Sequence, residues 1–383
     1  MEKNKKPQIR FKGFTDDWEQ RRFEEIFNYE RPDKYIVKSD KYEDNELTPV
    51  LTANKAFILG YTSEKNTYHK TDASIIFDDF TLDSKYVDFP YMVKSSAIKI
   101  LTLKDMKKDN LRFNYQLLNI TKFNMMGHAR HYISVVQPTP IMSTNKEEQD
   151  KISNLIKNID NLITLHQRKY DKLRNIKASL LGKMFPKDNK KVPEIRFKGF
   201  TDTWEQRKFE DFGKVVMCKR IFKEQTKEIG DVPFYKIGTF GEKADAFIDY
   251  QLFEEYKNKY PYPKKGAILI SASGSIGKIV EYQGKREYFQ DSNIVWLEHD
   301  SSIKNKFLKY IYQVVKWEGL EGSTIQRLYN SNILKTKILL PEVSEQAKIA
   351  NFFESIDNLI TLHQSKLEKL KKLKQALLNK MFI

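Results

Sequence analysis

Two long stretches of the chain carry apolar residues at alternating spacings of four and three, the pattern of a coiled-coil heptad. No proline or glycine interrupts residues 147–181. At about 1.5 Å per residue, the first stretch predicts a helix of roughly 50 Å. The predicted seam residues are Ile152, Ile156, Ile159, Ile163, His166 and Leu173 in the first stretch and Ile349, Phe353, Ile356, Ile360, His363 and Leu370 in the second.

The two stretches also agree at their polar seam positions. His166 and His363 occupy equivalent places, as do Lys177 and Lys374. Two such helices in one chain are expected to pack on each other. We expect the histidines to fix the register or to contact a partner helix rather than to bind metal or catalyse. An alternative is a coiled coil that only joins two domains, although apolar residues such as Leu162 widen the stripe and leave room for further partners.

The helical pattern belongs to a larger internal repeat. Residues 159–167 return unchanged at 356–364, and residues 7–16 return with one change at 193–202. The sequence Trp-Glu-Gln-Arg at residues 18–21 also recurs at 204–207. Each half therefore has the order opening motif, body, long helix, whereas the two bodies show no obvious match.

This order divides the chain into five segments. Strand-like stretches such as residues 73–77 and helical stretches such as 114–123 give the bodies a mixed α+β character. A duplicated frame with divergent bodies indicates a constant, pseudo-two-fold scaffold that presents two different binding heads. The predicted segments are residues 1–146 and 193–343 for the two globular domains, 147–186 and 344–383 for the two long helices, and 187–192 for the linker.

The net charge of +16 favours a polyanionic partner, usually a nucleic acid. The charge is uneven, because residues 151–191 alone carry 11 Lys/Arg against 3 Asp/Glu. A pair of helices with solvated lysines is therefore an alternative source of the excess. Cys218 is the one cysteine, which excludes an internal disulfide. A single cysteine suits a reducing, cytoplasmic setting. The chain has no run of about 18 apolar residues, and no apolar stretch follows its charged first residues. We therefore expect a cytoplasmic protein with no membrane span or signal peptide.

The first body contains a basic and aromatic cluster at residues 127–132. Arginine and histidine can contact phosphates or base edges, and tyrosine can stack on a base. The alternative is an ordinary polar loop. The candidate DNA contacts of this cluster are His128, Arg130, His131 and Tyr132.

In the second body, residues 266–279 predict a strand, a glycine loop and a second strand. The loop is not a nucleotide-binding P-loop, because Ala272 and Ile279 stand where that pattern needs glycine and Ser/Thr. A tight hairpin turn and a backbone loop close to a phosphate both remain open. The candidate contacts here are Ser273, Ser275 and Lys278.

A second glycine-containing stretch, residues 319–328, lies nearer the end of this body. It contributes Gln326 and Arg327, whose side chains suit base edges. Further along, Ser344 is the expected N-cap of the second long helix, with Glu345 in the first turn.

The duplicated Trp-Glu-Gln-Arg motif, the repeated helix, Glu345-Gln346 at its start and the loop at residues 274–278 together resemble the specificity subunits of type I restriction-modification systems. The resemblance covers essentially the whole chain. The first half departs from it in having no glycine–lysine loop, and the entry to its helix, Pro138-Thr139-Pro140, is followed only later by Glu148-Gln149.

The resemblance implies a double-stranded DNA partner and two target-recognition domains, each reading one half of a bipartite site. It also implies two long helices packed as an antiparallel coiled coil that set the spacing between the half-sites. Two methyltransferase subunits would dock on the protein, and endonuclease/translocase subunits would join the complex.

No catalytic centre is evident in the sequence. The chain has no Pro-Pro pair, and so lacks the Asn-Pro-Pro-aromatic motif expected of an adenine methyltransferase. We therefore expect a non-enzyme without cofactor or metal, with S-adenosylmethionine, ATP and Mg²⁺ bound on partner subunits only. The alternative function is a protein-only coiled-coil adaptor with two binding heads.

Overall fold

The computed structural model describes residues 6–43, 46–54, 56–68, 73–124, 129–187, 190–274, 276–319 and 327–383. The chain forms two compact units. Unit 1 combines residues 1–167 with residues 365–383, and unit 2 consists of residues 168–364. Each unit therefore contains one mixed domain and parts of both long helices, so neither half of the sequence makes a unit alone.

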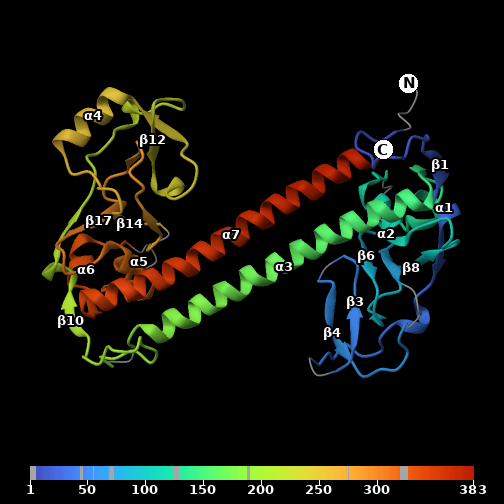
Figure 1. Ribbon diagram of the computed structural model, residues 1–383, viewed down its shortest axis with the longest axis horizontal. Helices are drawn as coiled ribbons and strands as arrows, with labels where there is room; N and C mark the ends of the chain where they lie inside the picture. Colours follow the sequence, from blue (N-terminus) through green and yellow to red (C-terminus); the bar gives the residue numbers. More distant parts are fainter. Residues whose placement is uncertain are drawn as a thin grey trace. The chain divides into compact units, whose positions relative to one another are not determined.

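The domain of unit 1 is built from short strands and two short helices around a buried sheet (Figure 1). Its four-stranded sheet has the order β2-β8-β5-β6, and a three-stranded sheet has the order β4-β3-β7. Its elements are β1 (Glu19–Arg22), α1 (Phe23–Ile26), β2 (Phe27–Glu30), η1 (Asp33–Tyr35), β3 (Thr48–Leu51), β4 (Ile58–Thr62), β5 (Ser74–Asp78), β6 (Ser84–Val87), β7 (Met92–Val93), β8 (Ile98–Leu103), α2 (Leu111–Ile120), η2 (Tyr132–Val136) and β9 (Pro140–Ser143).

The domain of unit 2 repeats this topology. Its sheets have the orders β11-β17-β14-β15 and β13-β12-β16, which match those of unit 1 strand for strand. Its elements are β10 (Glu205–Lys208), η3 (Phe209–Asp211), β11 (Gly213–Val216), η4 (Lys223–Gln225), β12 (Val232–Tyr235), η5 (Ile237–Thr239), β13 (Ala246–Ile248), α4 (Tyr250–Lys259), β14 (Ile268–Ser271), β15 (Ile279–Glu281), β16 (Tyr288–Phe289), β17 (Ile294–His299), α5 (Asn305–Val314), α6 (Asn330–Lys335) and β18 (Lys337–Leu340).

The two bodies therefore share a fold, although their sequences show no obvious match. A buried strand needs only apolar residues of suitable shape, so different sequences can build the same sheet. β5 and β14 are buried along their whole length and hold equivalent central places. Among the described residues between β4 and β5, no helix corresponds to α4. The predicted mixed α+β class is confirmed.

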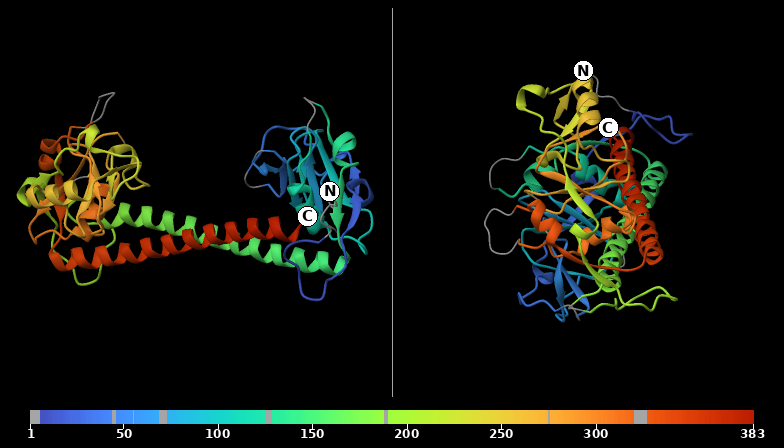
Figure 2. Two further views of the ribbon diagram at one scale, coloured as in Figure 1. Left: turned by 90° about the horizontal axis from the view of Figure 1, so that it is seen from above. Right: turned by 90° about the vertical axis from the view of Figure 1, so that its left-hand side faces the viewer.

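The long helices α3 (Lys146–Met184) and α7 (Val343–Met381) each have 39 residues. In unit 1 the first part of α3 lies beside the last part of α7, and the two run antiparallel (Figures 1 and 2). Lys374 Nζ lies 2.7 Å from Asp160 Oδ1 there. In unit 2 the pairing is reversed, and Lys177 Nζ lies 2.6 Å from Asp357 Oδ1. The predicted packing of the two helices is confirmed.

The start of α7 differs from our expectation. The helix begins at Val343, so Ser344 is its second residue and not its N-cap. Glu345 lies in the first turn as predicted, where it is fully buried and accepts from the side chain of Arg196. Among the described residues, no helix is both long and apolar enough to cross a membrane.

Candidate nucleic-acid interface

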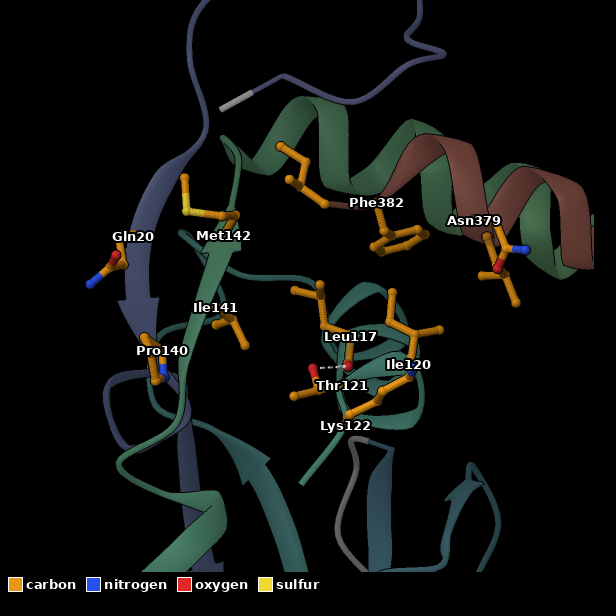
Figure 3. Close-up of a pocket in the computed structure, with 12 residues that line it drawn as sticks. Gln20, Leu117, Ile120, Thr121, Lys122, Pro140, Ile141, Met142, Asn379 and Phe382 are labelled. Atoms are coloured by element: carbon orange, nitrogen blue, oxygen red, sulfur yellow. Dashed lines mark hydrogen bonds between the residues drawn. The ribbon is translucent and has the colours of Figure 1, made fainter. Parts of the chain in front are cut away.

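Unit 1 has a pocket of about 480 Å³ beside the last turn of α7 (Figure 3). Apolar side chains such as Leu117, Met142 and Phe382 form much of its wall. Among the described residues that line it, Lys122 is the one with a charged side chain. No acid–base pair converges on this pocket, so it does not have the make-up of a catalytic site.

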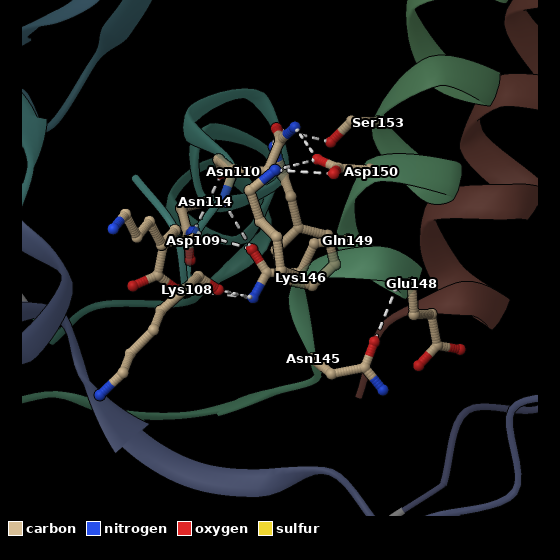
Figure 4. Close-up of polar contacts among 12 residues, drawn as sticks. Lys108, Asp109, Asn110, Asn114, Asn145, Lys146, Glu148, Gln149, Asp150 and Ser153 are labelled. Atoms are coloured by element: carbon tan, nitrogen blue, oxygen red, sulfur yellow. Dashed lines mark hydrogen bonds and ion pairs between the residues drawn. The ribbon is translucent and has the colours of Figure 1, made fainter. Parts of the chain in front are cut away.

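Each domain is fixed to its long helix by a buried Glu-Gln pair. In unit 1, Glu148 receives a bidentate ion pair from Arg10, at 2.7 and 2.9 Å. Gln149 Oε1 accepts from the backbone N of Asn110 at 2.8 Å, which holds the start of α2 (Figure 4). Asn110 in turn caps α2 by accepting from Phe113 N at 3.0 Å.

Unit 2 repeats this frame at the equivalent residues. Arg196 pairs with Glu345 through two contacts of 2.7 Å, and Gln346 Oε1 accepts from Lys304 N at 3.0 Å. Glu345 and Gln346 are both fully buried. Sequence reasoning noted these residues only as a helix start. The recurrence of Arg10 as Arg196 in the opening motif was the signal for the ion pair.

The glycine loop of unit 2 is the turn of the β14–β15 hairpin. Ser271 closes the turn, because its backbone O accepts from Gly277 N at 3.0 Å and its Oγ accepts from Lys278 N at 2.8 Å. Gly274 and Gly277 have φ values of 63° and 79°, which glycine adopts without steric cost. The hairpin interpretation is confirmed, and phosphate contact stays a prediction. Lys278 is partly exposed and pairs with Glu242 at 2.9 Å.

A second loop of unit 2 lies against this hairpin. Leu328 N donates to Ala272 O at 2.8 Å, and Ser273 forms an isolated antiparallel bridge with Arg327. Arg327 is exposed, and its guanidinium donates to Ser292 O at 3.4 Å. The fold thus brings together two predicted contacts, Ser273 and Arg327, that are far apart in the sequence. Ser275 and Gln326 lie outside the described residues.

Unit 1 has the same two parts in the same places. The β5–β6 hairpin turns at residues 79–83, where Asp78 Oδ1 accepts from Phe80 N and Thr81 N at 2.9 Å each. The segment before η2 attaches to this turn, because His131 N donates to Asp79 O at 2.9 Å. Arg130 is exposed, with its guanidinium carbon 5.8 Å from the centre of the Phe80 ring.

A buried ion pair strengthens this attachment in unit 1. Asp79 Oδ2 lies 3.0 Å from Lys99 Nζ, and both side chains are almost fully buried. The other oxygen of Asp79 accepts from Tyr132 N at 2.7 Å. Charge-assisted bonds of this kind are stronger than neutral ones, so the turn and the second segment are held as one surface.

Two candidate contacts in unit 1 require correction. The side chains of His131 and Tyr132 are buried, at 1% and 0% exposure. Tyr132 packs edge-on against Phe77 and Tyr29, with ring centres 5.4 Å apart in both pairs. We therefore remove His131 and Tyr132 from the DNA-contact set. His128 lies outside the described residues, which leaves Arg130 as the described candidate in this cluster.

The predicted helix seam divides into two groups by exposure. The buried members are Ile152, Ile156, Ile159, Ile349, Phe353 and Ile356, and the half-buried members are Ile163, His166, Leu173, Ile360, His363 and Leu370. Ile152 and Ile156 share a core with Leu378 and Met381 in unit 1. In the described part of the chain, no three His, Cys, Asp or Glu side chains are grouped closely enough to hold a metal ion.

Each unit also exposes a set of three apolar side chains on its helices. Unit 1 exposes Leu162, Leu165 and Leu373, and unit 2 exposes Leu359, Leu362 and Ile176, all between 38% and 49% exposed. The two sets occupy equivalent places in the repeat. Exposed apolar side chains are common in surfaces that bind protein partners.

Comparison with known proteins identifies the family. The profile described as "Type I restriction modification DNA specificity domain" matches residues 15–175 and 201–372. The Escherichia coli type I restriction enzyme EcoR124I/EcoR124II specificity subunit is 27% identical over 88% of this chain and 85% of its own length. The Methanocaldococcus jannaschii MjaVIII specificity subunit is 24% identical over 95% of this chain and 92% of its own length.

Partial and structural matches agree. A Haemophilus influenzae protein named as a type I restriction enzyme specificity subunit, S.HindORF215P, is 56% identical over 155 residues, which are 39% of this chain and 40% of that protein. The S subunit of a type I restriction-modification system from M. genitalium has the same fold, with a TM-score of 0.72, 16% identity and 99% coverage of both chains.

Both matched ranges coincide with the two domains and their long helices, and together they take in well over half of the sequence. The chain therefore belongs to the family of type I restriction-modification DNA specificity subunits, the non-catalytic component of a type I restriction-modification enzyme.

Proposed function

We propose that each unit reads one half of a bipartite DNA site with the surface formed by its hairpin turn and the segment attached to it. One observation carries this proposal: in both units, the attached segment bonds to the equivalent hairpin and bears an exposed arginine, Arg130 or Arg327. Arginine forms bidentate bonds with guanine and ion pairs with phosphate, and a turn between two strands can enter a groove. Family membership removes the protein-only adaptor as an alternative.

The two arginines provide matched tests. Arg327→Ala is expected to lower the discrimination between correct and incorrect bases in one half-site by about 1–3 kcal/mol, the value of a bidentate base contact. Recognition of the other half-site should not change. Arg130→Ala is expected to relax the opposite half-site.

Lys278→Ala is expected to weaken binding to all sequences and to lower the slope of log K against log salt by about 1. Binding selections with the full chain and its methyltransferase partner measure all three.

The outcomes separate the possible roles. Equal weakening of every sequence by Arg327→Ala would make that side chain a phosphate contact rather than a base contact. Two arginine variants that both affect the same half-site would contradict the assignment of one half-site to each unit.

We also propose that the exposed apolar sets on the helices dock two methyltransferase subunits, one on each set. The support is their equivalence, because two copies of one surface suit two copies of one partner. The endonuclease/translocase subunits would join through the complex, and S-adenosylmethionine, ATP and Mg²⁺ would be bound by these partners. The helices that carry the sets would also fix the distance between the half-sites.

Polar substitutions in one of the two exposed apolar sets are expected to prevent one methyltransferase subunit from binding. Leu162→Gln with Leu165→Gln should reduce the number of bound methyltransferase subunits from two to one, and Leu359→Gln with Leu362→Gln should do the same. Native mass spectrometry of the co-expressed complex measures this directly. Thr164→Gln, an exposed polar position on the same helix, is the control. Loss of both partners from a single pair of substitutions would argue against two separate docking sites.

A further inference from the structure

Unit 2 carries a group of cations around α4 that the hairpin surface does not include. Residues 257–265 and 283–286 contain six lysines and arginines and no aspartate or glutamate. Lys259 pairs with Glu255 at 3.0 Å. The other five, which we call the α4 basic surface, are all exposed, and none forms an ion pair with another described residue; they are Lys257, Lys264, Lys265, Lys285 and Arg286.

Tyrosines hold the two segments of this surface together. The Tyr262 hydroxyl lies 2.8 Å from that of Tyr282 and donates to Glu287 O at 2.6 Å. Gly266 N donates to Tyr282 O at 2.8 Å, and a Cβ at Gly284 would lie 3.3 Å from the Lys265 side chain. The loop between β15 and β16 is thus fixed against the chain that follows α4.

Aromatic rings also support two of the cations. The Arg286 guanidinium carbon lies 4.6 Å from the centre of the Tyr250 ring, and Lys257 Nζ lies 5.3 Å from that of Phe253. Such contacts hold a cation in place without neutralising it. Four acidic residues flank the two segments: Glu254 and Glu255 in α4, and Glu281 and Glu287 on either side of the loop. Of these, Glu255 pairs with Lys259 and Glu281 with Lys309. Like charges held together repel one another, so the surface is complementary to a polyanion.

The corresponding sequence segments of unit 1 have no such excess of cations, although the strands of the two units are equivalent. In unit 1, the loop between β6 and β7, residues 88–91, contains Asp88 and no lysine or arginine. In the sequence, residues 63–73 lie between β4 and β5 and contain two lysines, together with Glu64 and Asp72. The cations, which lie in α4, after it and in the β15–β16 loop, are therefore not part of the shared frame.

The position of the α4 basic surface separates it from the hairpin turn. β14 runs from this surface to the glycine loop, and the five steps from Ala267 to Ala272 span about 17 Å. That length corresponds to about five base pairs at 3.4 Å each. The cations are therefore too far from the turn to contact the same base pairs.

We propose that the α4 basic surface binds the phosphates of duplex DNA outside the half-site read by unit 2, so that the protein covers more flanking DNA on that side than on the other. The inference rests on the proposed function, because it assumes that the hairpin surface of unit 2 contacts bases. Lysines that carry no base-reading contacts bind the phosphate backbone without sequence preference. The interaction would add affinity and leave specificity unchanged.

The test uses the full-length chain and duplexes that end either at the site or 12 base pairs beyond it on one side. The half-site of unit 2 is identified as the one that Arg327→Ala relaxes. Extending the duplex beyond this half-site is expected to tighten binding, whereas extending it beyond the other half-site is expected to leave the affinity unchanged. Three phosphate contacts would make this advantage fall about 40-fold between 50 and 200 mM salt, since each adds about 0.9 to the slope. The variant K264Q/K265Q/K285Q is expected to lose the advantage.

These three lysines lie outside the ring contacts of Lys257 and Arg286, so the variant leaves the aromatic packing in place. K104Q/K107Q/K108Q removes the same charge from unit 1 and is expected to keep the advantage. Two results would overturn the inference: a gain in affinity that is equal for extension on either side, or a gain that persists in K264Q/K265Q/K285Q. The inference also fails if K264Q/K265Q/K285Q keeps the gain in affinity but no longer binds the methyltransferase. Failure of the wild-type chain to discriminate either half-site would instead overturn the proposed function.

Discussion

A fragment of residues 1–191 is expected to form a two-fold dimer that binds a palindrome of the half-site read by unit 1. The fragment keeps the first domain and all of α3 but lacks residues 365–383, which complete unit 1. Its own α3 carries the residues that could replace them. An isologous pairing of two identical heads recognises two identical half-sites.

The contacts of the two units show why α3 can replace the end of α7. In unit 1, Lys374 pairs with Asp160, and the Phe382 ring packs edge-on against Trp18 with ring centres 6.2 Å apart. In unit 2, Lys177 and Phe185 make the same contacts with Asp357 and Trp204, at 2.6 and 5.8 Å. A second copy of the fragment would therefore bring Lys177 to Asp160 and Phe185 to Trp18.

Sedimentation of the fragment and sequencing of the DNA that it selects with its methyltransferase partner are the measurements. Lys177→Glu should prevent the pairing, and Lys177→Glu with Asp160→Lys should restore it by reversing both charges. The gap between the two half-sites should equal that of the full chain if the helices set the distance. A monomeric fragment, or a dimer that selects an asymmetric site, would contradict the equivalence of the two halves.

Glu148→Ala is expected to destabilise unit 1 by about 3–5 kcal/mol, the usual effect of removing one partner of a buried ion pair. The Glu148 side chain is fully buried, and the Arg10 side chain is 11% exposed. Removing the carboxylate leaves the Arg10 guanidinium without its bidentate partner. It also removes the acceptor of Trp18 Nε1, which lies 3.3 Å from Glu148 Oε2. Thermal unfolding should show one transition moved to lower temperature.

Two other variants serve as controls for this result. Glu345→Ala removes the equivalent partner of Arg196 and should lower the transition of unit 2 instead. Glu147→Ala removes an exposed pair with Lys151, at 3.0 Å, and should change stability by about 0.5 kcal/mol or less. Equal effects of Glu147→Ala and Glu148→Ala would show that burial of the ion pair is unimportant.

The long helices and the duplicated frame could be predicted because their signals are local and repeated. The heptad pattern depends on spacings of three and four, and Ile152, Ile156 and Phe353 are buried where it places them. The exposed set at Leu162 also follows from the extra width of the apolar stripe. Likewise, the hairpin at Gly274 follows from glycines between two apolar runs.

The shared topology of the bodies could not be predicted, because a strand such as β5 constrains its residues to be buried but not to be particular residues. The burial of Tyr132 depends on Tyr29 and Phe77, which are distant in the sequence and become neighbours only in the folded sheet. The same holds for the partner of Glu148, which lies 138 residues away. Local patterns carry no information about such contacts.

The division of unit 1 between residues 1–167 and residues 365–383 has a consequence for synthesis of the protein. Domains near the N-terminus commonly fold while the rest of the chain is still being made. Unit 1 is not complete until residues 365–383 have been added, so the contact between Trp18 and Phe382 cannot form before then. Unit 2, which is continuous in the sequence, can close first. A nonsense mutation in the codons for residues 365–383 would therefore damage the first head, whose own codons it leaves intact.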